Sequence, residues 1–151
     1  MGRYRVCKSF TVESGHMLSK HPGSCRYPHG HTRVIEVVLS AEELDGNDMV
    51  VDFKAIKLLC QEHVERYDHR TALNSADPLL PAMQSVHPDS VLVFEDTDPT
   101  TEVIAREIFD FVTSALSAGF ERDGYLIAAG RVLLERIRVT ETPSSWAEYR
   151  I

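Results

Sequence analysis

Three histidines in this sequence have the type and spacing that a metal site requires. His29 and His31 are separated by one residue in the stretch CRYPHGH, and His16 ends an alternating segment further upstream. If His29 and His31 begin a strand, their side chains point to the same face, and hairpin pairing would bring His16 beside them. Three imidazoles at strand ends suit a tetrahedral Zn²⁺ whose fourth position is open. A turn that merely contains histidines explains the same residues, so spacing alone leaves both interpretations open.

Cys25 lies four positions before His29 and has three possible roles. It is a fourth zinc ligand that closes the site, a reactive thiol beside an open site, or a buried unreactive thiol. For Cys7 and Cys60 we favour the unreactive role, because Cys60 falls on an apolar helix face and Cys7 on a strand without a partner. Three scattered cysteines and no secretory segment indicate a reducing, cytoplasmic location.

Two further positions carry groups that could act on protons or bind a ligand. Asp68 and His69 follow a predicted helix, where a histidine often interacts only with the helix dipole. An aspartate next to a histidine can also orient the imidazole for acid–base chemistry. Glu141 stands near the end of an apolar strand, either as a solvated charge or as an acceptor for a guanidine-like pair of N–H groups.

Hydrophobic periodicity predicts the elements that position these residues. We expect strands over 3–15 and 31–42, a helix over 53–67, a loop over 70–90 and a short strand over 90–95. A second helix is expected with Asp98 as N-cap, Pro99 at its first position and Gly119 at its end. Two more strands are expected over 131–141 and 146–151. This order predicts one α+β domain over 1–151, with an antiparallel sheet and both helices on one face.

Composition excludes two classes of partner. The formal charge is -7, from 23 acidic and 16 basic residues, and lysine and arginine form no cluster. Nucleic-acid-binding domains carry a basic patch, so no nucleic-acid partner is expected. The sequence also has no apolar run long enough to span a membrane.

Together these motifs resemble the 6-pyruvoyltetrahydropterin synthase family. The resemblance spans roughly residues 4–150 and rests on five motifs in order: His16, Cys25-x3-His29-Gly30-His31, Asp68-His69, Pro99-Thr100-Thr101-Glu102 and Glu141-Thr142. The three-residue gap between Cys25 and His29 is similar to that of the bacterial 6-carboxytetrahydropterin synthases of queuosine (7-deazaguanine) biosynthesis.

The resemblance implies a role for each motif. It implies Zn²⁺ on His16, His29 and His31, a substrate that is 7,8-dihydroneopterin triphosphate, and a product, 6-carboxytetrahydropterin, formed with loss of triphosphate and acetaldehyde. It implies that Cys25, Asp68 and His69 are catalytic. The residues implied to bind the pterin are Glu141, Thr100, Thr101 and Glu102.

The resemblance also implies the tunnelling fold, in which four-stranded sheets are pooled into a barrel within a homohexamer, a dimer of trimers. Two alternatives stay open: formation of 6-pyruvoyltetrahydropterin on the same site, and a non-catalytic zinc or pterin-binding protein. The sequence departs from the family pattern at Arg70, where a second histidine is frequent, and at residues 119–130, which have no counterpart.

Overall fold

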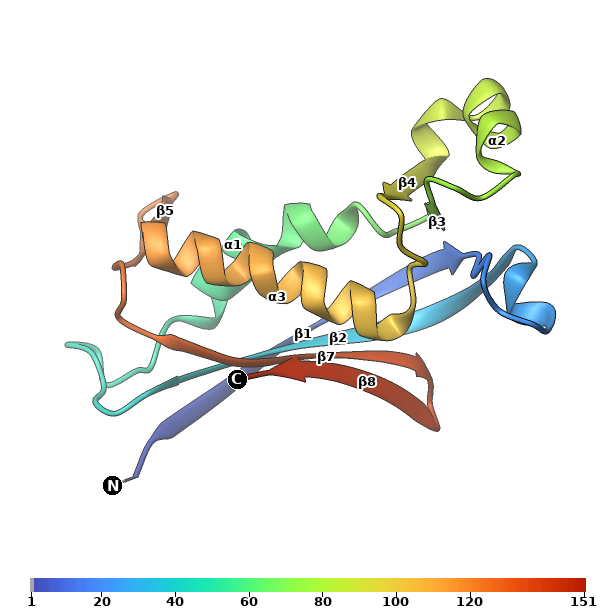
Figure 1. Cartoon of the computed structure of the whole chain (residues 1–151). Helices are drawn as coiled ribbons and strands as arrows, with labels where there is room; N and C mark the ends of the chain where they lie inside the picture. The colour runs from blue at the N-terminus through green and yellow to red at the C-terminus, as the bar shows by residue number, and fades with distance from the viewer. Residues whose placement is uncertain (1) are drawn as a thin grey trace.

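The protein is built on a curved sheet with two long helices, α1 and α3, on one face (Figure 1). A computed structural model describes residues 2–151. The elements in chain order are β1 (Tyr4–His16), the 3₁₀ helix η1 (Ser24–Arg26), β2 (His29–Ala41), α1 (Phe53–Glu65), β3 (Thr71–Asn74), α2 (Leu80–Val86), the 3₁₀ helix η2 (Pro88–Ser90), β4 (Val91–Phe94), α3 (Thr101–Ala118), β5 (Phe120–Arg122), β6 (Tyr125–Ile127), β7 (Leu133–Thr142) and β8 (Ser145–Arg150). The predicted α+β class is confirmed.

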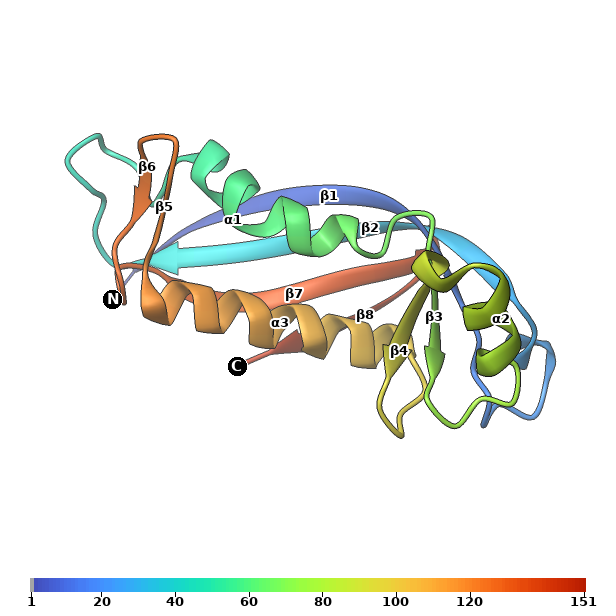
Figure 2. The same cartoon turned by 90° about the horizontal axis from the view of Figure 1, so that it is seen from above.

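The main sheet has six strands in the order β4-β3-β1-β2-β7-β8. Four of them, β1, β2, β7 and β8, form the expected antiparallel part, and β1 and β2 pair along their whole length from Tyr4↔Ala41 to His16↔His29. The prediction of a four-stranded sheet was incomplete. The short strands β3 and β4 extend the sheet in parallel beside the end of β1, as Figure 2 shows from above.

The predicted loop over 70–90 was wrong, because it contains β3, α2 and η2. Its prolines suggested breaks, but Pro81 occupies the first turn of α2, where the missing N–H costs no hydrogen bond. Leu73 and Leu80 are buried with Met17 in a small second core. Burial of these apolar side chains stabilises by about 1.5–3 kcal/mol each and holds the segment against the end of β1.

The main core lies between the sheet and the two long helices. Asp52 caps α1, because its side chain accepts a hydrogen bond from the N–H of Lys54. The predicted start of α3 was wrong by two residues: Thr100 is the cap, and its hydroxyl accepts from the N–H of Val103. Asp98 instead accepts from Ser19 and from Asn74, which ties the loop after β1 to the segment before α3. Gly119 ends α3 as expected, with φ 82°.

Residues 119–130, unassigned from sequence, form a hairpin of β5 and β6. Asp123 and Gly124 turn the chain with φ of 53° and 81°, the left-handed pair that a two-residue hairpin loop needs. The Asp-Gly dipeptide was the sequence signal for this turn. Cys60 is fully buried, as expected, whereas Cys7 is exposed, so its predicted burial was wrong. Alternate residues of β1 face away from the helices, and Cys7 is one of them.

Candidate metal centre

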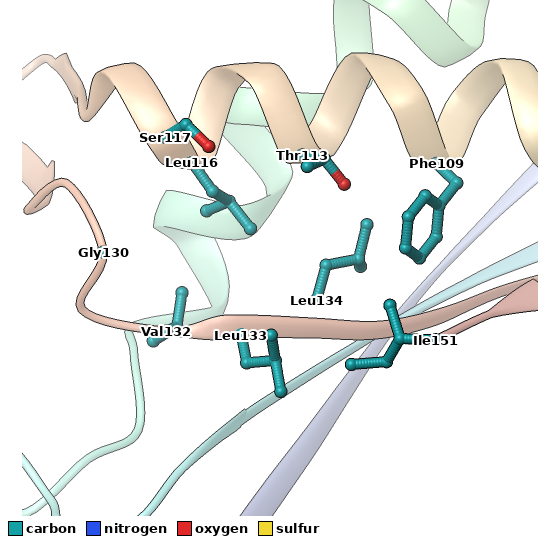
Figure 3. Close-up of a pocket in the computed structure, with 9 residues that line it drawn as sticks. All are labelled: Phe109, Thr113, Leu116, Ser117, Gly130, Val132, Leu133, Leu134 and Ile151. Carbon is teal, nitrogen blue, oxygen red and sulfur yellow. The ribbon is translucent and has the colours of Figure 1, made fainter.

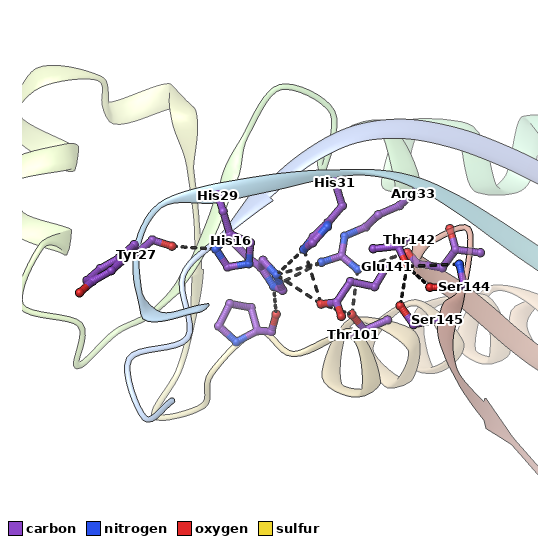
Figure 4. Close-up of polar contacts among 12 residues, drawn as sticks. His16, Tyr27, His29, His31, Arg33, Thr101, Glu141, Thr142, Ser144 and Ser145 are labelled. Atoms are coloured by element: carbon purple, nitrogen blue, oxygen red, sulfur yellow. Dashed lines mark hydrogen bonds and ion pairs between the residues drawn. The ribbon is translucent and has the colours of Figure 1, made fainter. Parts of the chain in front are cut away.

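The three histidines meet at the end of β1 and the start of β2 (Figure 4). One nitrogen from each of His16, His29 and His31 lies within 4.8 Å of the others, and the Nε2 atoms of His16 and His31 are 3.2 Å apart. The strand register places His16 directly opposite His29. A Cβ at Gly30 would lie 3.3 Å from the carbonyl oxygen of Ser14, so glycine allows the close strand approach here. The predicted grouping of the three side chains is confirmed.

In His16 and His29, a backbone carbonyl determines which ring nitrogen is free to bind a metal. His16 Nδ1 lies 2.8 Å from the carbonyl oxygen of Pro99, and His29 Nδ1 lies 2.7 Å from that of Tyr27. Because a carbonyl only accepts, both Nδ1 atoms must carry the proton. Each Nε2 then keeps its lone pair, which is the arrangement found around metal-bound histidines.

The surroundings also hold two of the imidazoles neutral at pH 7. Burial, with a smaller contribution from the Arg33 cation, lowers the pKa of His16 to about 4, although the hydrogen bond to Pro99 opposes this shift. Burial lowers the pKa of His31 as well, with a second contribution from Arg33 that Glu141 opposes. Neutral imidazoles can bind a metal ion without first releasing a proton. The donor set therefore fits the implied Zn²⁺.

Glu141 and Thr101, two of the residues expected to bind the pterin, lie next to the histidines. Glu141 Oε1 is 3.6 Å from the Nε2 atoms of both His16 and His31, and the Thr101 hydroxyl donates to it over 3.3 Å. Thr100 uses its hydroxyl as the cap of α3, and Glu102 is exposed in the first turn. Of the four residues expected to bind the pterin, Glu141 and Thr101 therefore lie beside the histidine group.

Sequence reasoning missed Arg33, which is 0% exposed and contacts both His16 and Thr101. The available signal was its position on β2, two residues after His31 on the core-facing side of an otherwise aliphatic stretch. A charged residue there is expensive to bury unless it is paired.

The predicted catalytic residues lie outside the contacts of the histidine group, and only Asp68 and His69 contact each other. Asp68 Oδ2 accepts a hydrogen bond of 2.7 Å from His69 Nδ1, and Asp68 Oδ1 accepts from the N–H of Glu13. The His69 side chain is 80% exposed, at a residue with φ 57°. Cys25 is half-buried in η1. Within residues 2–151, the hydrogen bonds and ion pairs of the three histidines, Arg33 and Glu141 include neither Cys25 nor His69.

Two cavities differ in what they could hold. An open pocket of about 450 Å³ is lined by Asp68, His69 and Arg70 together with residues of the α2–β4 segment. An apolar pocket of about 160 Å³ lies between β7 and the C-terminal half of α3 (Figure 3). The histidine group sits at the opposite end of α3, beside its first residues. The apolar pocket therefore belongs to the core and not to the polar site.

Replacing Asp68 with asparagine is expected to lower the pKa of His69. The hydrogen bond from His69 to Asp68, together with the charge of Asp68, raises the His69 pKa above its ordinary value. The carboxylate favours the protonated ring, so removing its charge shifts the titration to lower pH. NMR titration of the His69 ring in both proteins measures this shift. An unchanged His69 titration in the Asp68→Asn protein would show that Asp68 does not set the protonation of this group.

Comparisons with known proteins agree with this arrangement. Residues 5–151 match the family model described as 6-pyruvoyl tetrahydropterin synthase. The 6-carboxy-5,6,7,8-tetrahydropterin synthase of Aquifex aeolicus is 28% identical over 98% of this chain and 98% of its own length. The synthase of the same name from Rickettsia bellii is 29% identical over 95% of this chain and 98% of its own.

Solved structures share the fold. An uncharacterized protein from Wolinella succinogenes superposes with a TM-score of 0.81 at 21% identity, covering 99% of both chains. The 6-pyruvoyl tetrahydropterin synthase of Caenorhabditis elegans superposes with a TM-score of 0.67 at 20% identity, covering 100% of this chain and 97% of its own. No helix among the described residues is long and apolar enough to cross a bilayer. The family model covers nearly the whole sequence, and this chain belongs to the 6-pyruvoyl tetrahydropterin synthase family.

Proposed function

We propose that this protein is a zinc-dependent lyase that converts 7,8-dihydroneopterin triphosphate into 6-carboxy-5,6,7,8-tetrahydropterin, with release of acetaldehyde and triphosphate. This reaction is a step toward queuosine and other 7-deazaguanines. The observation that carries the proposal is the convergence of one ring nitrogen from each of His16, His29 and His31 beside a carboxylate, Glu141. The names of the curated relatives support the 6-carboxy product over the pyruvoyl product.

His16, His29 and His31 would hold the zinc ion. The ion, when bound, supplies positive charge that acidifies substrate hydroxyl groups. Glu141 would accept hydrogen bonds from the amino and ring N–H groups of the pterin, and the start of α3, with Thr100, Thr101 and Glu102, would complete its pocket. A carboxylate can accept two parallel N–H bonds, which makes it a selective anchor for such an edge.

Cys25 would act as the base that moves protons between the pterin ring and its side chain. A free thiol has a pKa near ~8.5, so a catalytic thiol at neutral pH needs an acid–base partner. His69, which is oriented by its hydrogen bond to Asp68, would be that partner.

The separation of these groups within one chain supports a shared site. The Asp68–His69 pair borders its own open pocket, and no histidine ligand lines that pocket. The strand β8 lies at an edge of the sheet, where a second chain can pair. We therefore propose that a homohexamer, a dimer of trimers, combines the metal centre of one subunit with catalytic residues of another. Light scattering coupled to size-exclusion chromatography would test this, and a monomeric active protein would contradict it.

The reaction is tested by incubating the zinc-loaded protein with 7,8-dihydroneopterin triphosphate and identifying the products by mass spectrometry. The proposal expects 6-carboxytetrahydropterin and acetaldehyde in about equal amounts. Metal-stripped protein and the His29→Ala variant serve as controls and are expected to be inactive. A pyruvoyl product without acetaldehyde would instead show that the protein forms 6-pyruvoyltetrahydropterin. Binding of zinc and pterin without turnover would assign the non-catalytic role.

A further inference from the structure

Arg33 links the histidine group to Glu141 through a buried chain of contacts (Figure 4). Its Nη1 donates to the Thr101 hydroxyl over 2.9 Å, and its Nη2 lies 3.3 and 3.4 Å from the two ring nitrogens of His16. The guanidinium group therefore lies directly against the His16 ring. Nε of Arg33 is buried without a hydrogen-bond partner, so its desolvation lowers the stability of the folded protein.

The Thr101 hydroxyl has its direction fixed by this contact. A hydroxyl has one proton, and an arginine N–H can only donate. Thr101 therefore accepts from Arg33 and has its proton left for Glu141 Oε1, at 3.3 Å. Both Arg33 and Thr101 are buried, at 0% and 5% exposure, whereas the Glu141 side chain that they contact is 36% exposed.

Glu141 is close to where a fourth zinc ligand would stand. Zinc–nitrogen bonds of about 2.0–2.1 Å in a tetrahedron place neighbouring ligand atoms about 3.4 Å apart. Glu141 Oε1 lies 3.6 Å from the Nε2 atoms of both His16 and His31, whereas no nitrogen of His29 lies within 4.0 Å of this carboxylate. Carboxylate oxygen is an ordinary zinc ligand. A small movement of this side chain would close the site and exclude the substrate.

We propose that Arg33 and Thr101 are positioning residues that restrain Glu141 and keep the fourth coordination position open. The hydrogen bond from Thr101 and the positive charge of Arg33 keep the Glu141 carboxylate away from the metal. It is then free to bind the substrate. The inference rests on the proposed zinc centre. It does not depend on which pterin is converted.

The Thr101→Val variant tests the restraint with little change in shape. Cobalt-substituted protein is titrated with imidazole, a probe for an open metal position, and its absorption spectrum follows the coordination. In Thr101→Val, Glu141 is expected to bind the metal, so imidazole affinity should fall at least tenfold and metal affinity should rise. Thr101→Ser keeps the hydroxyl and is expected to keep the imidazole affinity and the metal affinity of the unmodified protein. Arg33→Met should weaken imidazole binding in the same direction as Thr101→Val.

The double variant Thr101→Val/Glu141→Gln identifies the group that occupies the position. It is expected to recover imidazole binding to within about twofold of the unmodified protein, because an amide is a poorer zinc ligand. Unchanged imidazole affinity in Thr101→Val, or no recovery in the double variant, would overturn the restraint. Metal binding by the unmodified protein is measured first, and its absence would instead refute the zinc centre. The two failures are thus distinguishable.

Discussion

Replacing His29 with alanine is expected to weaken zinc binding at least about 100-fold and to abolish turnover. Loss of a direct ligand should exceed the 10- to 100-fold effect of losing a group that only supports a ligand. His29 is the informative position because it is only partly buried, whereas His16 is completely buried and its removal would also leave a cavity. Zinc content after dialysis against a graded chelator series measures the effect.

His87→Ala is the matched control for this experiment. His87 is exposed at the end of α2 and is not one of the three grouped histidines, so its loss should leave zinc content unchanged. Circular dichroism should show both variants folded. Full zinc occupancy in His29→Ala would show that His29 is not a zinc ligand. Equal zinc loss in both variants would mean that the effect is not specific to the three-histidine group.

The grouping of the three histidines could be predicted because it depends on local rules. Alternation along a strand puts His29 and His31 on one face, and a hairpin with no bulge carries that register to His16. Arg33 obeys the same alternation, but its partners come from α3 and β7. No spacing along the sequence connects residue 33 with residue 101, so its role became visible only in the folded chain.

The parts of the fold that were missed depend on distant packing. β3 is four residues long, and it is held by pairing with β1 and β4 and by burial of Leu73 against Met17 and Leu80. Such a short segment carries too little periodicity to be distinguished from a loop. Asp98 looked like a helix cap because of the proline after it. Its carboxylate instead accepts hydrogen bonds from Ser19 and Asn74, far away in the sequence.

Replacing Cys25 with alanine is expected to lower turnover about 10²- to 10⁴-fold while zinc stays bound. This is the size of effect that positioned acid–base groups have in enzymes. The three histidines form a ligand group without Cys25, which lies in η1 and outside their contacts. A thiol that acts on protons can therefore be removed without loss of a metal ligand. Zinc content and steady-state turnover are measured on the same preparation.

Cys7→Ala is the matched control, because Cys7 is an exposed thiol that lies on β1, well before His16. It should keep both zinc and turnover. The two measurements separate the roles that the sequence left open for Cys25. Loss of zinc in Cys25→Ala would make the thiol a fourth ligand of a closed structural site. Retention of zinc together with full turnover in Cys25→Ala would show that the Cys25 thiol has no catalytic role. Only retained zinc with lost turnover fits a base that lies beside the metal and acts with the Asp68–His69 pair.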